Sequence, residues 1–205
     1  MSPSIGGAIE KLRSFGRHLD PNVSSQMHGQ AYGLTMFSAI MPGQSEALAA
    51  YIDTWEDGQA SPLARIRRLH CSRVHILDEL VYQGEPQVPE PLNSSYLIFT
   101  ASFDGGLDEF LDDLIAEMPG EADALWGHCV GYPGTADGGE LKRWTRHNQI
   151  DNHYFLGHYP SATVRDVRQG LEQRRRVAKF AAGAQGMDAA TLQQEFRAEF
   201  GTGSP

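Results

Sequence analysis

Cysteine is scarce in this sequence. Cys71 and Cys129 are the two cysteines in 205 residues, and they lie far apart rather than in a C-x-x-C arrangement. A disulfide-stabilised scaffold carries more cysteines in a shorter chain, so this class of protein is excluded. We expect both cysteines to be reduced core residues, because free cysteine usually packs as a small hydrophobic side chain.

Long hydrophobic runs are also missing, although 40% of the residues are hydrophobic. No apolar run approaches the roughly 20 residues that a membrane-spanning helix requires. Residues 1–20 lack the continuous apolar region and the small-residue cleavage site of a secretory signal. We therefore expect a cytoplasmic protein without a membrane partner.

Positive charge is in the minority. The chain has 17 lysine and arginine residues against 26 aspartate and glutamate residues, which gives a net charge of −9. A nucleic-acid-binding protein needs a basic face to replace the counterions on phosphate. The locally basic stretch at residues 165–179 spreads its charges around much of a helix, which is typical of a solvated surface. We expect no nucleic-acid partner.

Several catalytic motifs are absent as well. The sequence has no Gly-x-Ser-x-Gly elbow, no glycine-rich phosphate loop with a lysine, and no His-Glu-x-x-His pattern. These absences argue against hydrolases, kinases and zinc proteases. His128 beside Cys129 supplies two potential metal ligands, whereas a zinc site needs three or four from the protein. We predict no metal site.

What the sequence does contain is an alternation of strand-like and helical segments. Apolar and β-branched runs predict four strands, at residues 32–41, 69–77, 95–103 and 153–159. Apolar side chains at helical spacing predict two helices among them, at residues 45–55 and 107–118. The order β-α-β-β-α-β predicts an α+β fold of the ferredoxin-like kind, an antiparallel sheet with two helices on one face.

Further helices are expected around this core. The same spacing predicts N- and C-terminal helices and one short internal helix, at residues 5–19, 140–147, 163–182 and 188–200. The chain is then expected to have three parts. These are an N-terminal helix and linker (1–30), the ferredoxin-like α+β domain (31–182) and a C-terminal helical tail (183–205).

Such a fold leaves one face of its sheet uncovered. An apolar face of this kind must be buried, and pairing with a second copy into a closed barrel is the usual solution. We therefore expect a homodimer. The alternative cover is the C-terminal helix folding back across the sheet, which would allow a monomer.

Three separated segments also carry a family resemblance. In chain order they are SPLARIRRLHCSRVHILDE, SSYLIFTASFDGGLDEFLDDL and LWGHCVGYPG. They resemble a bacterial family of uncharacterised proteins over about residues 33–180. The fold that this resemblance implies is similar to the dimeric α+β barrel superfamily. That superfamily includes cofactor-free monooxygenases, haem proteins such as chlorite dismutases and dye-decolourising peroxidases, and sugar or lactone isomerases. Because one scaffold carries such varied chemistry, fold alone does not choose a function.

Histidines are the main chemical resource of the sequence. Alternation along the second predicted strand places Arg73 and His75 on one face and His70 on the other. A histidine beside an arginine can bind an anion, a carboxylate substrate or a haem propionate. The structural alternative is a cross-strand pair with a carboxylate, or a place at the sheet edge.

Two further histidines lie outside that strand. His128 follows Trp126-Gly127 and precedes a glycine-containing loop, and glycines let the backbone approach a ligand closely. The structural alternative is that Trp126 anchors the loop while His128 bonds a carbonyl group. His158, on the last predicted strand, suits an axial haem ligand if it projects into an apolar cavity.

These residues define the predicted site. We predict catalytic roles for His128, His70 and Arg73, and cofactor-binding roles for His158 and His75.

Three functions stay open for such a site. The first is a small-molecule enzyme of the oxidoreductase or monooxygenase kind. Its apolar substrate would lie between sheet and helices, with a histidine as general base or polar anchor. The second is a haem-binding protein of the peroxidase or chlorite-dismutase kind, so the cofactor is either none or haem. The third is a non-catalytic module whose terminal helices dock a partner protein.

Overall fold

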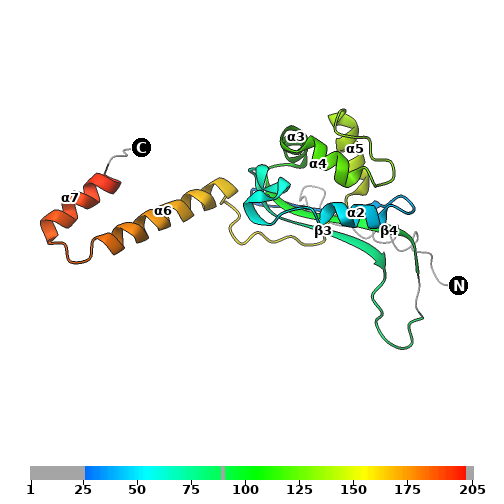
Figure 1. The fold of residues 1–205 in the computed structure, drawn as a ribbon, viewed down its shortest axis with the longest axis horizontal. Coiled ribbons are helices and arrows are strands. Elements are labelled where there is room, and N and C mark those ends of the chain that lie inside the picture. Colours follow the sequence, from blue (N-terminus) through cyan, green and yellow to red (C-terminus); the bar gives the residue numbers. More distant parts are fainter. Residues whose placement is uncertain (1–25, 89–90, 202–205) are drawn as a thin grey trace. The chain divides into compact units, whose positions relative to one another are not determined.

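A computed structural model describes residues 26–88 and 91–201 of the chain (Figure 1). The predicted helix at residues 5–19 lies outside this range. The chain forms two compact units that divide between Val164 and Arg165, earlier than the boundary at residue 182 that the sequence suggested. The division into three parts stays a prediction.

The first unit is built on a four-stranded antiparallel sheet. Its strands lie in the spatial order β1-β2-β4-β3. They are β1 (Met27–His28), β2 (Ala31–Ala39), β3 (Leu69–Glu79) and β4 (Pro91–Asp104). β4 is central and pairs with β2 on one side and β3 on the other. Together with the helices on one of its faces, this sheet confirms the α+β class.

The topology differs from the predicted βαββαβ order. Residues 153–159, predicted as the last strand, form no regular structure, and β1, within the predicted linker, pairs with β2 instead through Met27 and Tyr32. The predicted segment contains Gly157 and ends before Pro160, and both residue types weaken a strand ladder. The ferredoxin-like prediction is therefore wrong in its last strand, although three of its strands and both its helices are present.

Helices of this unit cover one face of the sheet (Figure 1). They are α2 (Ser45–Ile52), α3 (Leu107–Glu117), α4 (Pro119–Trp126) and α5 (Gly138–Asn148). The predicted helices correspond to α2, α3 and α5. α4 was not predicted, because Pro119 resembles a helix stop after α3. Proline is in fact favoured in the first turn of a helix, where its missing N–H would be unpaired anyway. Short 3₁₀ turns, Gly58–Ala60 and Pro62–Arg65, precede β3.

The core lies between the helices and the sheet face that they cover, here called the inner face. Its sheet residues are Tyr32, Leu34, Met36, Ser38, Ser72, Val74, Ile76, Leu97, Phe99, Ala101 and Phe103. Phe110 of α3 stacks on Phe103 with ring centroids 4.0 Å apart, and Trp126 of α4 meets Phe99 edge-on. A cavity of about 10 Å³ is found there, which is about the room that one water molecule needs.

The second unit contains two helices, α6 (Val164–Gly183, beginning at the unit boundary) and α7 (Ala189–Phe200). They confirm the predicted C-terminal helices. Phe180, Phe196 and Phe200 pack together with ring centroids 4.9 to 5.7 Å apart. Asp188 caps α7, and hydrogen bonds from Thr191 and the nearby backbone lower the pKa of this carboxyl. Within residues 26–88 and 91–201, no helix is long and apolar enough to cross a membrane.

Candidate functional site

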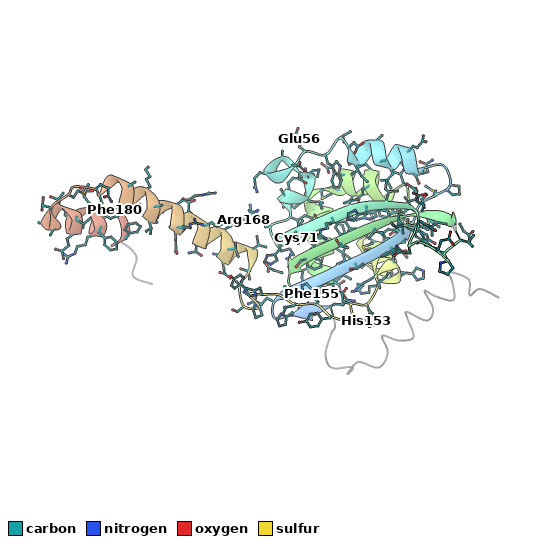
Figure 2. The ribbon with its side chains drawn as sticks, turned by 90° about the horizontal axis from the view of Figure 1, so that it is seen from below. Glu56, Cys71, His153, Phe155, Arg168 and Phe180 are labelled. Carbon is teal, nitrogen blue, oxygen red and sulfur yellow. The ribbon has the colours of Figure 1, made fainter. Side chains whose placement is uncertain are left out.

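The side of the sheet opposite the helices, here called the open face, carries a different set of side chains. Figure 2 views this side, with the strands in front of the helices. Strand alternation assigns to it Gly33, Thr35, Phe37 and Ala39 of β2, Tyr96, Ile98, Thr100 and Ser102 of β4, and Cys71, Arg73, His75 and Leu77 of β3. These residues form rows across the three strands.

The open face has two ends of different character. At its polar end, the rows are Gly33–Ser102–Cys71 and Thr35–Thr100–Arg73. At its apolar end, the rows are Phe37–Ile98–His75 and Ala39–Tyr96–Leu77. The sheet therefore places a guanidinium group among hydroxyl groups at one end and aromatic and aliphatic side chains at the other.

A hollow of about 220 Å³ lies over the polar end. Its walls include Thr35, Thr100, Ser102, Cys71 and Arg73 from the strands and Asn152, Tyr154 and Phe155 from the segment after α5. Cys71 and Phe155 mark this end of the sheet in Figure 2. No aspartate or glutamate is among the described residues that line the hollow. The arrangement can bind a small polar molecule.

The segment after α5, residues 149–161, is here called the strap because it is fastened to β1 and β2. Asn152 Nδ2 donates to the Gly33 carbonyl oxygen at 2.7 Å. A Cβ atom at position 33 would lie 2.8 Å from Cδ2 of Phe155, closer than such atoms normally approach. Glycine at position 33 therefore lets the strap bring an aromatic ring onto the sheet beside the hollow.

Arg73 is exposed and has no carboxylate partner within the described part of the chain. His75 lies two residues further along β3 and is also exposed. The prediction that Arg73 and His75 share a face is confirmed by their register with Thr100 and Ile98. Arg73 lines the hollow, and His75 lies one row beyond it.

His70 lies at an irregularity of β3, where the register shifts between Leu69 and Cys71. The bulge invalidates the simple alternation that assigned His70 to a face, because an extra residue breaks the period of two. Its Nε2 atom is 2.7 Å from Oδ1 of Asp104, whose other oxygen accepts a hydrogen bond from the backbone N–H of Val164. This is the cross-strand carboxylate pair that the sequence left as an alternative.

His128 lies in the turn after α4 and is half-buried. Its Nδ1 atom is 2.9 Å from Oε1 of Gln44, and Trp126 is buried in the core. Both parts of the structural alternative are confirmed, because Trp126 is anchored in the core and His128 bonds a carbonyl oxygen, that of the Gln44 side chain. His128 lines neither the hollow nor the core cavity, so the structure does not bring it together with Arg73.

The two cysteines occupy opposite environments. Cys129 is buried, as expected, and burial raises the pKa of its thiol to about 12. Cys71 is exposed on the open face, so the prediction that both cysteines lie in the core is wrong for Cys71. The physical reason is alternation: Cys71 shares the side of β3 that carries Arg73 rather than the side that carries Val74.

His158 and His75 are the two residues that the sequence suggested for cofactor binding. His158 is exposed and packs edge-on against Tyr159, with ring centroids 4.7 Å apart. Neither His158 nor His75 lines either of the two cavities, whereas an axial ligand must project into an apolar space. Among the described residues, no group of three or more His, Cys, Asp or Glu side chains could hold a metal ion.

Sequence reasoning missed the hydroxyl residues of the hollow, Thr35, Thr100 and Ser102, together with Asn152. Part of the information needed to find these residues is present in the sequence. In β2 and β4, polar or small residues alternate with buried apolar ones, which is the pattern of a sheet with one covered face. The contribution of Asn152 could not be found in this way, because the segment that carries it resembles a strand.

Comparisons with known proteins give a partial match. No family model and no solved structure matches the chain. The chain is 32% identical over 90 residues to pyranose dehydrogenase 3 of Leucoagaricus meleagris. The match covers 42% of this chain and 15% of that protein, so the chain spans a small part of its relative's length. The structure itself shows an α+β protein with a hollow on the open face of its sheet.

Proposed function

We propose that this chain is an oxidoreductase, or part of one, that oxidises a small hydroxylated molecule bound at the polar end of the open face. The hollow over Arg73, Thr35 and Thr100 carries this proposal, because convergent polar groups in a concavity are the usual mark of a ligand site. The partial similarity to pyranose dehydrogenase 3 supports the reaction class.

The proposed reaction converts a secondary alcohol into a ketone. The carbon that bears the hydroxyl group loses a hydride, and the hydroxyl oxygen loses its proton. The hydride passes to a two-electron acceptor of the quinone class, and the proton follows by way of a base, so that the acceptor becomes a hydroquinone. Arg73 would hold the substrate, and His75, on the neighbouring row of the same face, would accept the hydroxyl proton. Similarity to a dehydrogenase favours this reaction over the oxygen insertion of a monooxygenase.

The homodimer remains part of this proposal. Phe37, Ile98, Tyr96 and Leu77 form a continuous set at the apolar end, and a second copy would bury them, as in a dimeric α+β barrel. The native mass of the purified chain tests this point directly. A dimer that dissociates on Phe37→Glu substitution supports the proposal, and a monomeric wild-type chain contradicts it.

Activity is tested on the purified full chain with D-glucose and a quinone-type dye whose reduction is followed by absorbance. Substrate-dependent bleaching that falls at least roughly ten-fold in His75→Gln supports the proposal, since general bases contribute 10²- to 10⁴-fold. His153→Gln, at an exposed histidine of the strap that does not line the hollow, is the matched control. Absence of bleaching across a panel of sugars and sugar acids contradicts the proposed function.

A second candidate function, protein docking, rests on α6. Val167, Leu171 and Val177 are 45%, 46% and 53% exposed in that helix, and exposed apolar side chains of this kind suit the docking of a partner protein by a terminal helix. Charged substitutions such as Leu171→Glu would abolish docking and leave oxidation unchanged, so the two functions can be separated.

A further inference from the structure

We propose that the substrate of this site is a hydroxylated carboxylate, of which a sugar acid is the simplest form. This inference rests on the proposed function and names the class of molecule that the hollow selects. It depends on three properties of the hollow: its charge, its unused hydroxyl groups and its aromatic wall.

The charge of the hollow is opposite to that of the chain. The chain carries a net charge of −9, yet the hollow is lined by Arg73 and by no described aspartate or glutamate. The carboxylate nearest in register is Asp104, which follows Ser102 along β4 and is engaged by His70 and the Val164 N–H group. Arg73 is thus left to an external anion, and a guanidinium group binds a carboxylate through two parallel hydrogen bonds.

The hydroxyl groups beside Arg73 are also unused. The side chains of Thr35, Thr100 and Ser102 form no hydrogen bond with any residue in the described part of the chain. All three are half-buried and line the hollow. A half-buried hydroxyl group without a protein partner needs one from solvent or ligand. Ligand hydroxyl groups can both donate to these side chains and accept from them.

The strap adds an apolar wall of limited size. Tyr154 and Phe155 line the hollow with aromatic rings, against which the C–H face of a saturated ring packs well. The volume of about 220 Å³ lies below the 300–1,000 Å³ typical of drug-sized ligands. The hollow therefore fits one six-membered ring that carries a carboxylate and hydroxyl groups, rather than a longer chain of rings.

Calorimetric titration of the full chain with three probes tests this inference. D-glucuronate has both the carboxylate and the hydroxyl groups, D-glucose has only the hydroxyl groups, and cyclohexanecarboxylate has only the carboxylate. We expect glucuronate to bind at least roughly ten-fold more tightly than either of the other two, because glucose lacks the carboxylate for Arg73 and cyclohexanecarboxylate lacks the hydroxyl groups for the threonine and serine side chains. Equal binding of glucose and glucuronate would overturn the inference, as would absence of glucuronate binding.

Variants locate the binding in the hollow. Arg73→Gln should reduce glucuronate affinity to the level of glucose, and Thr100→Val should weaken both sugars. Arg67→Gln is the matched control, because Arg67 is exposed but does not line the hollow. Unchanged glucuronate affinity in Arg73→Gln would overturn the inference.

The failure of this inference and the failure of the proposed function give different results. If glucose is bound and oxidised as well as glucuronate, the oxidoreductase proposal stands and the carboxylate requirement fails. If glucuronate is bound through Arg73 but reduces no quinone, the carboxylate site stands and the oxidoreductase proposal fails.

Discussion

The two faces of the central strand β4 lie in different environments. Phe99 points to the inner face and is 1% exposed, in edge-on contact with Trp126. Thr100, the next residue, lies on the open face and lines a hollow. The inner face leaves a cavity of about 10 Å³, whereas the open face leaves about 220 Å³.

Under the proposed function, this difference assigns stability to one face and ligand binding to the other. Apolar area removed from water is the main favourable term in folding, and the inner face supplies it through aromatic and aliphatic packing. Polar groups without protein partners add little to folding, so Arg73, Thr35 and Thr100 are free to serve a ligand. The comparison predicts that substitutions on the two faces have separable consequences.

The largest expected effect is on the inner face. Phe99→Ala should lower the free energy of unfolding by about 3–5 kcal/mol, because it leaves a cavity in a packed core. Thr100→Ala, the neighbouring change on the open face, should lower it by less than about 1 kcal/mol. Urea denaturation of both variants measures these free energies of unfolding. Similar losses in the two variants would contradict the assignment of the faces.

Thiol reactivity gives the next largest contrast. At pH 8, a maleimide should label Cys71 at least roughly a hundred-fold faster than Cys129, because thiolate and access are both needed. Cys129 is buried and its pKa is raised to about 12. Mass spectrometry should show one label in the native chain and two in denaturant. Rapid native labelling of a Cys71→Ser variant would contradict this prediction.

A smaller effect is expected at the strap. Asn152→Ala removes the hydrogen bond from Nδ2 to the Gly33 carbonyl oxygen and should lower the free energy of unfolding by about 1 kcal/mol. Gly33→Ala should displace the Phe155 ring, which would lie 2.8 Å from the new Cβ atom, and weaken glucuronate binding. Scanning calorimetry measures the stability of Asn152→Ala, and titration calorimetry measures the glucuronate affinity of Gly33→Ala. An unchanged affinity in Gly33→Ala would argue against a contribution of the strap to binding.

The last prediction concerns alkaline pH. Burial raises the pKa of Cys129 from an ordinary value of 9.0 to about 12. Between these values the folded chain holds a proton that the unfolded chain loses, so stability falls as pH rises above 9. Cys129→Ala should flatten this fall when unfolding is measured from pH 8 to 10.5. An identical slope in both proteins would rule out a contribution from Cys129.

Much of the fold could be predicted from the sequence. Alternation and helical spacing located β2, β3 and β4 and most helices, because each has a clear apolar side that packs against the core. The strand predicted at 153–159 is absent because its apolar residues pack as an irregular strap. β1 was missed because a strand of two residues is too short to show an alternating pattern of apolar and polar side chains. α4 was missed because a proline after one helix also opens the next.

The site was less predictable than the fold. Arg73 and His75 could be placed on one face because the alternation of β3 is regular between them. The partners of His70 and His128, Asp104 and Gln44, could not be predicted, because they lie 34 and 84 residues away in the sequence. Such pairings depend on the tertiary structure, and no local sequence pattern predicts them. The threonine and serine residues of the hollow form a polar cluster only because neighbouring strands bring them together, so none of them could be recognised from its own segment of sequence.

The central claim is that ligand binds on the open face rather than between sheet and helices. Amide chemical-shift mapping during titration with D-glucuronate tests it most directly. The account predicts changes concentrated at Thr35, Arg73, Thr100, Ser102 and Asn152, and lost in Arg73→Gln. Changes concentrated in α3, α4 and α5, with the open-face amides unmoved, would contradict it.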